Sequence, residues 1–99
     1  MTRFEKFDAS KYLDTEEAIA EFLAAALEDE NPDVFIAALG TIAKARGMTQ
    51  IAREAGLGRE SLYKTLTPGS KLRYDTVRKL MNALGVKFTV SPAGSSTQA

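Results

Sequence analysis

The 99-residue chain is predicted to adopt an all-α fold of five to six helices that ends in one short β-strand. Three observations support this prediction. Apolar residues recur every three or four positions in successive segments. Asn, Pro and Gly stand at the breaks between those segments. Only over residues 86–90 do β-branched and aromatic side chains alternate with others, as in a strand.

The first helix is expected over about residues 15–30. Asp14 has the position of an N-cap, and Glu17, three residues later, completes a capping box. The following apolar residues have helical spacing: Ile19, Phe22, Leu23, Ala26 and Leu27.

A second helix is expected over about residues 32–46, with Asn31 as N-cap and Pro32 at its first position. Gly47 is a natural C-terminal stop. The residues expected to be buried are Phe35, Ile36, Leu39, Ile42 and Ala43. Two short helices should follow at about 48–55 and 58–66.

The last helix is expected over about residues 75–84 and should stop at Gly85. The predicted strand, 86–90, has no partner strand in an otherwise helical chain, and an unpaired edge is a liability unless it is covered. We therefore expect it to pair with its copy in a homodimer or with another protein's sheet. Its candidate dimerisation residues are Val86, Phe88 and Val90.

Residues 48–66 have the features of a helix-turn-helix. Ala52 is small enough for the second helix to cross close to the first, and Gly56 can adopt the positive φ of a tight turn. Leu57 and Leu62 then face the core. A short second helix with polar and basic outer residues is suited to the major groove of DNA. The alternative is an ordinary helical hairpin within a bundle.

Arg59 is the expected base reader of this unit, because a guanidinium can bond guanine through two N–H groups. Neighbouring polar and basic side chains would contact other base edges or phosphates. The candidate DNA-binding residues are Thr49, Gln50, Arg53, Arg59, Glu60, Ser61, Tyr63, Lys64, Lys71 and Arg73.

The net charge of zero conceals a division between the two halves of the chain. Residues 1–40 contain three basic and ten acidic side chains, a net charge of −7, whereas residues 41–99 contain ten basic and three acidic ones, a net charge of +7. This division suggests a polyanion as partner of the second half and a basic partner for the first. Alternatively, the two halves simply attract each other.

Composition argues against most catalytic chemistry. The chain has no Cys and no His. This excludes disulfides and thiolate chemistry, and it excludes catalysis or metal binding by an imidazole. Adjacent carboxylates, such as Glu16 with Glu17, are better explained as solvated surface than as an acid/base pair. We therefore expect no enzyme activity, cofactor or metal. Neither a signal peptide nor a membrane span is recognisable, so the expected compartment is the cytoplasm.

Many short motifs at fixed separation carry a family resemblance. They are Phe7-Asp8, Tyr12-Leu13-Asp14, Glu17-Ala18-Ile19, 24–33, 37–40, 43–47, 51–57, Arg59 to Lys64, and Asp75-Thr76-Val77. Residues 48–66 and their flanking helices resemble the Cro/repressor-type helix-turn-helix domain. Nearly the whole chain resembles the addiction-module antidote proteins, the HigA-like antitoxins partnered with RelE/HigB-like toxins.

The resemblance implies a protein that neutralises a ribosome-dependent mRNA endonuclease and represses the shared operon at a palindromic operator. Residues 1–31 would then form an acidic, toxin-facing arm and helix, 32–90 the DNA-binding domain with its strand, and 91–99 a disordered tail. The candidate toxin-binding residues are Phe4, Phe7, Tyr12, Leu13, Glu16, Glu17 and Glu21. Two alternatives remain: the first helix only packs on the domain or its dimer mate, or the protein is a solitary regulator without a toxin.

Overall fold

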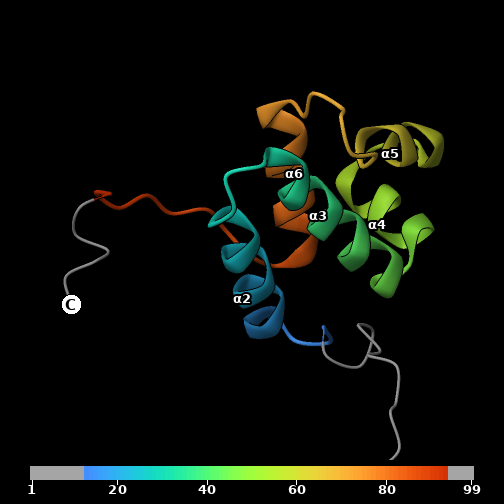
Figure 1. Cartoon of the computed structure of the whole chain (residues 1–99). Coiled ribbons are helices and arrows are strands. Elements are labelled where there is room, and N and C mark those ends of the chain that lie inside the picture. The colour runs from blue at the N-terminus through green and yellow to red at the C-terminus, as the bar shows by residue number, and fades with distance from the viewer. Residues whose placement is uncertain (1–12, 94–99) are drawn as a thin grey trace, which may run out of the picture.

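The computed structural model describes residues 13–93, which form five α-helices and no strand (Figure 1). The all-α class expected from the sequence is confirmed. The helices are α2 (Glu16–Leu27), α3 (Pro32–Arg46), α4 (Met48–Ala55), α5 (Arg59–Thr65) and α6 (Tyr74–Leu84).

Helix α2 begins and ends slightly inside the predicted limits. Its N-cap is Thr15 rather than Asp14, because the Thr15 hydroxyl accepts a hydrogen bond from the Ala18 N–H at 3.0 Å. The helix ends at Leu27, because the next two N–H groups donate to carbonyls only three residues back. The turn that follows is closed by Asp29, whose Oδ1 accepts from the Asn31 N–H at 2.8 Å.

Helix α3 has the predicted bounds. Asn31 is its N-cap, since Oδ1 accepts from the Asp33 N–H at 2.9 Å, and Pro32 occupies the first turn. At the other end Gly47 has a φ of 105°, which L side chains rarely adopt, and the chain turns there into α4.

The turn between α4 and α5 contains the left-handed glycine expected there. Gly56 has a φ of 73°, and the Leu57 N–H donates to the Ala52 carbonyl at 2.8 Å, which closes the end of α4. Leu57 is half-buried against the core. The short helices α4 and α5 are therefore held in a compact pair.

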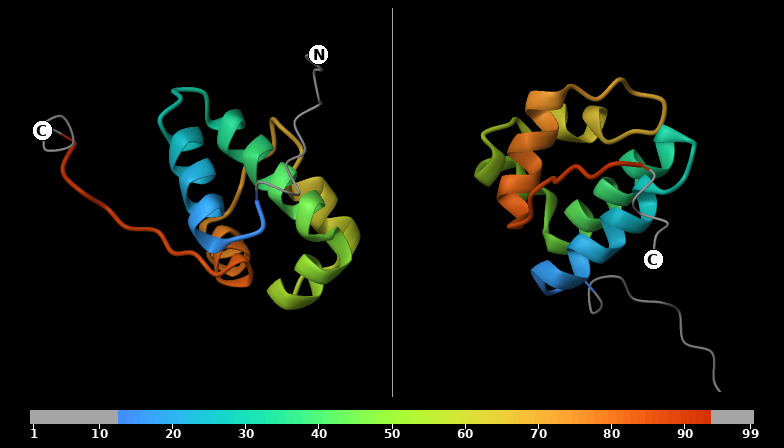
Figure 2. Two further views of the ribbon diagram at one scale, coloured as in Figure 1. Left: turned by 90° about the horizontal axis from the view of Figure 1, so that it is seen from below. Right: turned by 90° about the vertical axis from the view of Figure 1, so that its left-hand side faces the viewer.

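The core lies where α3 passes between α2 and α4, with α6 behind it (Figures 1 and 2). It contains no buried polar side chain among residues 13–93, so burial of apolar surface is the main stabilising contribution. The largest completely buried side chains are Leu13, Ile19, Leu39, Ile42, Ile51, Leu62 and Leu80.

The strand expected over residues 86–90 is not present. This segment is extended, but strand pairing needs a neighbouring strand to exchange hydrogen bonds, and residues 13–93 contain none. Val86 and Phe88 instead pack on the helices, with the Phe88 ring centroid 6.0 Å from that of Phe35. Val90 is 96% exposed on the segment that leaves the helical body (Figure 2).

Candidate functional site

An open hollow lies between the outer faces of α4 and α5. Its volume is about 710 Å³, and the end of α3 contributes Lys44 to its wall. The residues that line it are Lys44, Gly47, Met48, Thr49, Gln50, Arg53, Glu54, Arg59 and Tyr63. We call this surface the α4–α5 hollow.

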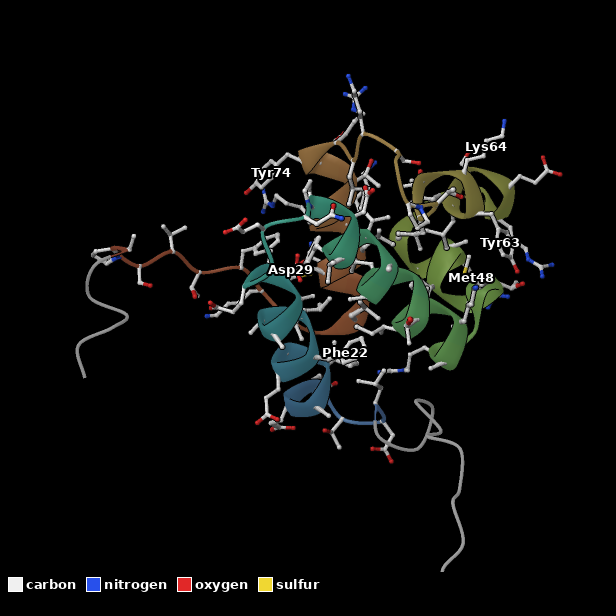
Figure 3. The ribbon with its side chains drawn as sticks, viewed as in Figure 1. Phe22, Asp29, Met48, Tyr63, Lys64 and Tyr74 are labelled. Carbon is white, nitrogen blue, oxygen red and sulfur yellow. The ribbon has the colours of Figure 1, made fainter. Side chains whose placement is uncertain are left out.

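Five of the ten candidate DNA-binding residues lie together in the α4–α5 hollow: Thr49, Gln50, Arg53, Arg59 and Tyr63. The other three candidates on α5, Glu60, Ser61 and Lys64, are exposed but do not line it. Figure 3 shows the difference within α5, since Tyr63 and Lys64 point away from one another. The helix thus presents two adjoining outer faces.

Arg59 is oriented by Tyr63, one helical turn further along α5. Its guanidinium carbon lies 5.5 Å from the Tyr63 ring centroid, within the range of a cation–π interaction. One of its terminal nitrogens donates to the Tyr63 hydroxyl at 3.4 Å, a long hydrogen bond. A guanidinium has five N–H donors, so this contact positions Arg59 while leaving it donors for another partner.

The charge of the α4–α5 hollow is predominantly positive. Lys44, Arg53 and Arg59 line it against a single carboxylate, Glu54, which accepts from Gln50 Nε2 at 3.1 Å. Such a concave, basic surface attracts polyanions.

Lys44 was not among the sequence candidates for this surface. It lies in the last turn of α3, where a cation is favourable at the negative end of the helix dipole whether or not it binds a partner. The sequence contains no local signal for its second location, because only the packing of α3 on α4 brings it to the hollow.

Lys71 and Arg73 lie outside the α4–α5 hollow, in the segment that leads to α6. Arg73 forms an exposed ion pair with Asp75, with Nε 3.4 Å from Oδ1. Lys71 lines a separate hollow beside the turn between α2 and α3. These two residues are therefore not part of one continuous site with Arg59 in the hollow.

The acidic half of the chain forms a second charged surface. Residues 13–43 contain eight carboxylates and no Lys or Arg. Glu16, Glu17 and Glu21 are all exposed on α2. This surface and the α4–α5 hollow have opposite charge.

The apolar candidates for toxin binding have a different outcome. Phe4, Phe7 and Tyr12 lie outside the described residues. Leu13 has no exposed surface and belongs to the core, so it is not available as a surface anchor in this structure. The sequence alone could not show that Leu13 is buried, since an apolar residue next to a helix start can pack inward or remain at the surface.

Within 13–93, no three His, Cys, Asp or Glu side chains are grouped so as to hold a metal ion. None of the helices in this part of the chain has the length and apolar character needed to span a membrane.

Comparisons with known proteins support a relationship over most of the chain. A family model described as "Probable addiction module antidote protein" matches residues 3–92. A protein of Haemophilus influenzae described as an uncharacterized protein is 44% identical over 84 residues, which span 85% of this chain and 87% of that protein. No solved structure matches.

Proposed function

This chain belongs to the family of probable addiction module antidote proteins, and from that premise we propose that it neutralises a toxin and represses the operon that encodes both proteins. The antidote part follows from the family. The DNA-binding part is our proposal, and the observation that carries it is the basic hollow in which Arg53 and Arg59 lie beside Lys44.

In the proposed DNA complex, α5 enters the major groove and α4 crosses the backbone, as in a Cro/repressor-type helix-turn-helix. Arg59 is the base reader, since its guanidinium is already oriented by Tyr63. Arg53 and Lys44 contact phosphates, together with Thr49 and Gln50. Binding of this kind weakens steeply as the salt concentration rises, because phosphate contacts release condensed counterions.

The faces of α5 outside the hollow extend the proposed contact. Ser61 and Lys64 are exposed on it, with Glu60 in its first turn. Because these residues lie close to Arg59 on the same helix, they could contact the adjoining base edges and phosphates. In this arrangement Lys71 and Arg73 would not contact the DNA and would contribute only to the positive electrostatic field around the site.

A palindromic operator requires two copies of the chain. We propose a homodimer that places two α5 helices in major grooves about 34–36 Å apart, one turn of DNA. Val90 is the exposed candidate for the dimer contact, whereas Val86 and Phe88 already pack on their own chain. Pairing of the 86–90 segments would supply the strand partner that residues 13–93 of one chain do not contain.

The proposed toxin is RelE/HigB-like, an RNA-cleaving protein with a basic surface. The exposed carboxylates Glu16, Glu17 and Glu21 would steer such a partner to α2. Phe4, Phe7 and Tyr12 are the proposed apolar anchors of the preceding arm. This is a binding function, and we propose no catalytic step for this chain.

The second candidate function is a solitary transcription regulator. It explains the α4–α5 hollow equally well, but it does not explain eight carboxylates without a basic residue over 13–43. The family description also favours a toxin partner.

The test uses the full chain and the product of the reading frame that adjoins its gene. We expect the two proteins to co-purify, and growth arrest by the second protein to be reversed by the first. A DNA fragment from upstream of the gene should be retarded in a gel at low salt and released as salt rises. If the neighbouring product neither binds nor arrests growth, the antitoxin function is refuted. If DNA is not bound specifically, the repressor function is refuted.

A further inference from the structure

A second hollow lies beside the turn that joins α2 to α3. Its volume is about 550 Å³, and seven of the thirteen residues that line it are apolar: Ala26, Leu27, Pro32, Phe35, Ile36, Leu72 and Val77. Its walls come from α2, α3, the loop before α6, and α6 itself. We call it the turn hollow. Its size is within the range of pockets that accept small ligands or side chains from a partner.

The rim of the turn hollow is acidic. Asp29, Glu30 and Asp33 line it, and Lys71 is the one basic residue among those that do. Asp29, which is labelled in Figure 3, is exposed beside α2. An apolar floor with an acidic rim is complementary to an apolar side chain flanked by Lys or Arg.

Hydrogen bonds hold the turn hollow in shape before any partner arrives. Asp29 accepts from the Asn31 N–H at 2.8 Å, and Asn31 accepts from the Asp33 N–H at 2.9 Å. Asp33 accepts in turn from the Gly69 N–H at 2.9 Å, which ties the far wall to the turn. A preformed site loses less conformational entropy on binding.

Leu27 is the residue that a partner would cover. It is 52% exposed at the last position of α2, although it lines the apolar hollow. An isolated exposed Leu needs no explanation, but an exposed Leu on the edge of an apolar hollow marks a surface that binding can bury.

We propose that the turn hollow is a docking site for a segment of the toxin that carries one apolar anchor side chain flanked by Lys or Arg. The proposal rests on the proposed antitoxin function and adds a surface distinct from the acidic residues near the start of α2. A second copy of this chain fits less well, because symmetric docking would bring two acidic rims together.

The test measures affinity of the full chain for the adjoining gene's product. Leu27→Ala removes most of the apolar side chain that the toxin's anchor residue would contact. We expect a dissociation constant on the order of tenfold larger. Glu30→Lys reverses a rim charge, and we expect a similar loss together with a weaker dependence on salt. Glu54→Lys is the matched control, since it makes the same charge change at an exposed position on α4, outside both the turn hollow and the acidic start of α2.

A crosslinking experiment locates the contact directly, because the chain has no Cys of its own. Leu27→Cys carries a photo-activated crosslinker, and Asn82→Cys, exposed on α6, is the control. We expect Leu27→Cys to crosslink to a toxin segment that contains Lys or Arg, and Asn82→Cys not to crosslink.

Each outcome decides a different claim. If the wild-type chain does not bind the toxin, the antitoxin function fails and the docking site fails with it. If the wild-type chain binds, Leu27→Ala binds equally well and Leu27→Cys does not crosslink to the toxin, only the docking site is refuted. If Glu30→Lys and Glu54→Lys weaken binding equally while Leu27→Ala does not, overall charge is responsible and the turn hollow is not.

Discussion

The carboxylate of Asp33 accepts a hydrogen bond from the backbone N–H of Gly69 at 2.9 Å, across 36 positions of sequence. Asp33 lies in the first turn of α3, and Gly69 lies in the loop that follows α5. The bond therefore fastens the loop that leaves the α4–α5 unit to the first turn of α3. One side chain contributes both to a helix start and to a long-range tertiary contact.

Replacing Asp33 with Ala should lower the free energy of unfolding by about 1 kcal/mol, a typical net value for one hydrogen bond, with a further contribution of tenths of a kcal/mol from the helix dipole. Asp33→Asn, which retains an oxygen acceptor, should lose less. Urea denaturation of the two variants and the wild type makes the comparison. Equal stability of Asp33→Ala and wild type would show that the bond contributes nothing.

Replacing Arg59 with Ala should weaken operator binding by about 1–3 kcal/mol and relax specificity at one base pair. Arg59→Lys should recover part of the affinity but little of the specificity, since an ammonium cannot make the two-pronged contact. Titration of specific and scrambled DNA at fixed salt measures both. The assignment fails if Arg59→Ala still discriminates the two DNAs as wild type does.

Gly85 is expected to be the least tolerant glycine of the described chain. It has a φ of 79°, and a Cβ there would lie 2.8 Å from Glu16 Cγ, so Gly85→Ala meets both backbone strain and a clash. Gly69→Ala is the control for strain alone, because its φ is 96° and nothing lies within 4 Å of its Cβ.

Thermal unfolding should therefore rank Gly85→Ala below Gly69→Ala. Adding Glu16→Ala to Gly85→Ala should restore part of the loss, since it removes the atoms that clash. A double variant no more stable than Gly85→Ala would show that strain, and not the contact, sets the cost.

Gly58→Ser should stabilise the protein by a few tenths of a kcal/mol. Gly58 is the N-cap of α5 and has an extended backbone with a φ of −73° and ψ of 148°, which Ser adopts without strain. No side chain caps this helix, so a hydroxyl there gains a role. Its Cβ would lie 3.8 Å from Ser61 Oγ, an ordinary contact. A small rise in the urea midpoint is the expected result, and a fall would contradict it.

Val90→Lys should weaken the proposed homodimer without unfolding the chain, since Val90 is 96% exposed. Phe88→Ala should instead lower the stability of the folded chain, because the Phe88 ring packs against Phe35. Sedimentation over a concentration series separates the two effects. An unchanged dimer constant for Val90→Lys would exclude this segment as the dimer contact.

Local signals account for the parts of the fold that the sequence predicted well. The bounds of α3, with Asn31 as N-cap and Gly47 at its end, depend on hydrogen bonds within a few residues of each terminus. The shift of the α2 cap from Asp14 to Thr15 marks the limit of such signals, because two neighbouring residues can both cap. The strand over 86–90 is not confirmed in the single chain, because a strand is defined by its partner and residues 13–93 contain none.

The sequence by itself determined the helices, the Gly56 turn and the separation of negative from positive charge, because these depend on local spacing and composition. Only the tertiary structure decided that Lys44 joins Arg59 in one hollow, that Leu13 is buried, and that Leu72 and Leu27 line another hollow together. The physical reason is that these relationships arise from packing between segments distant in sequence.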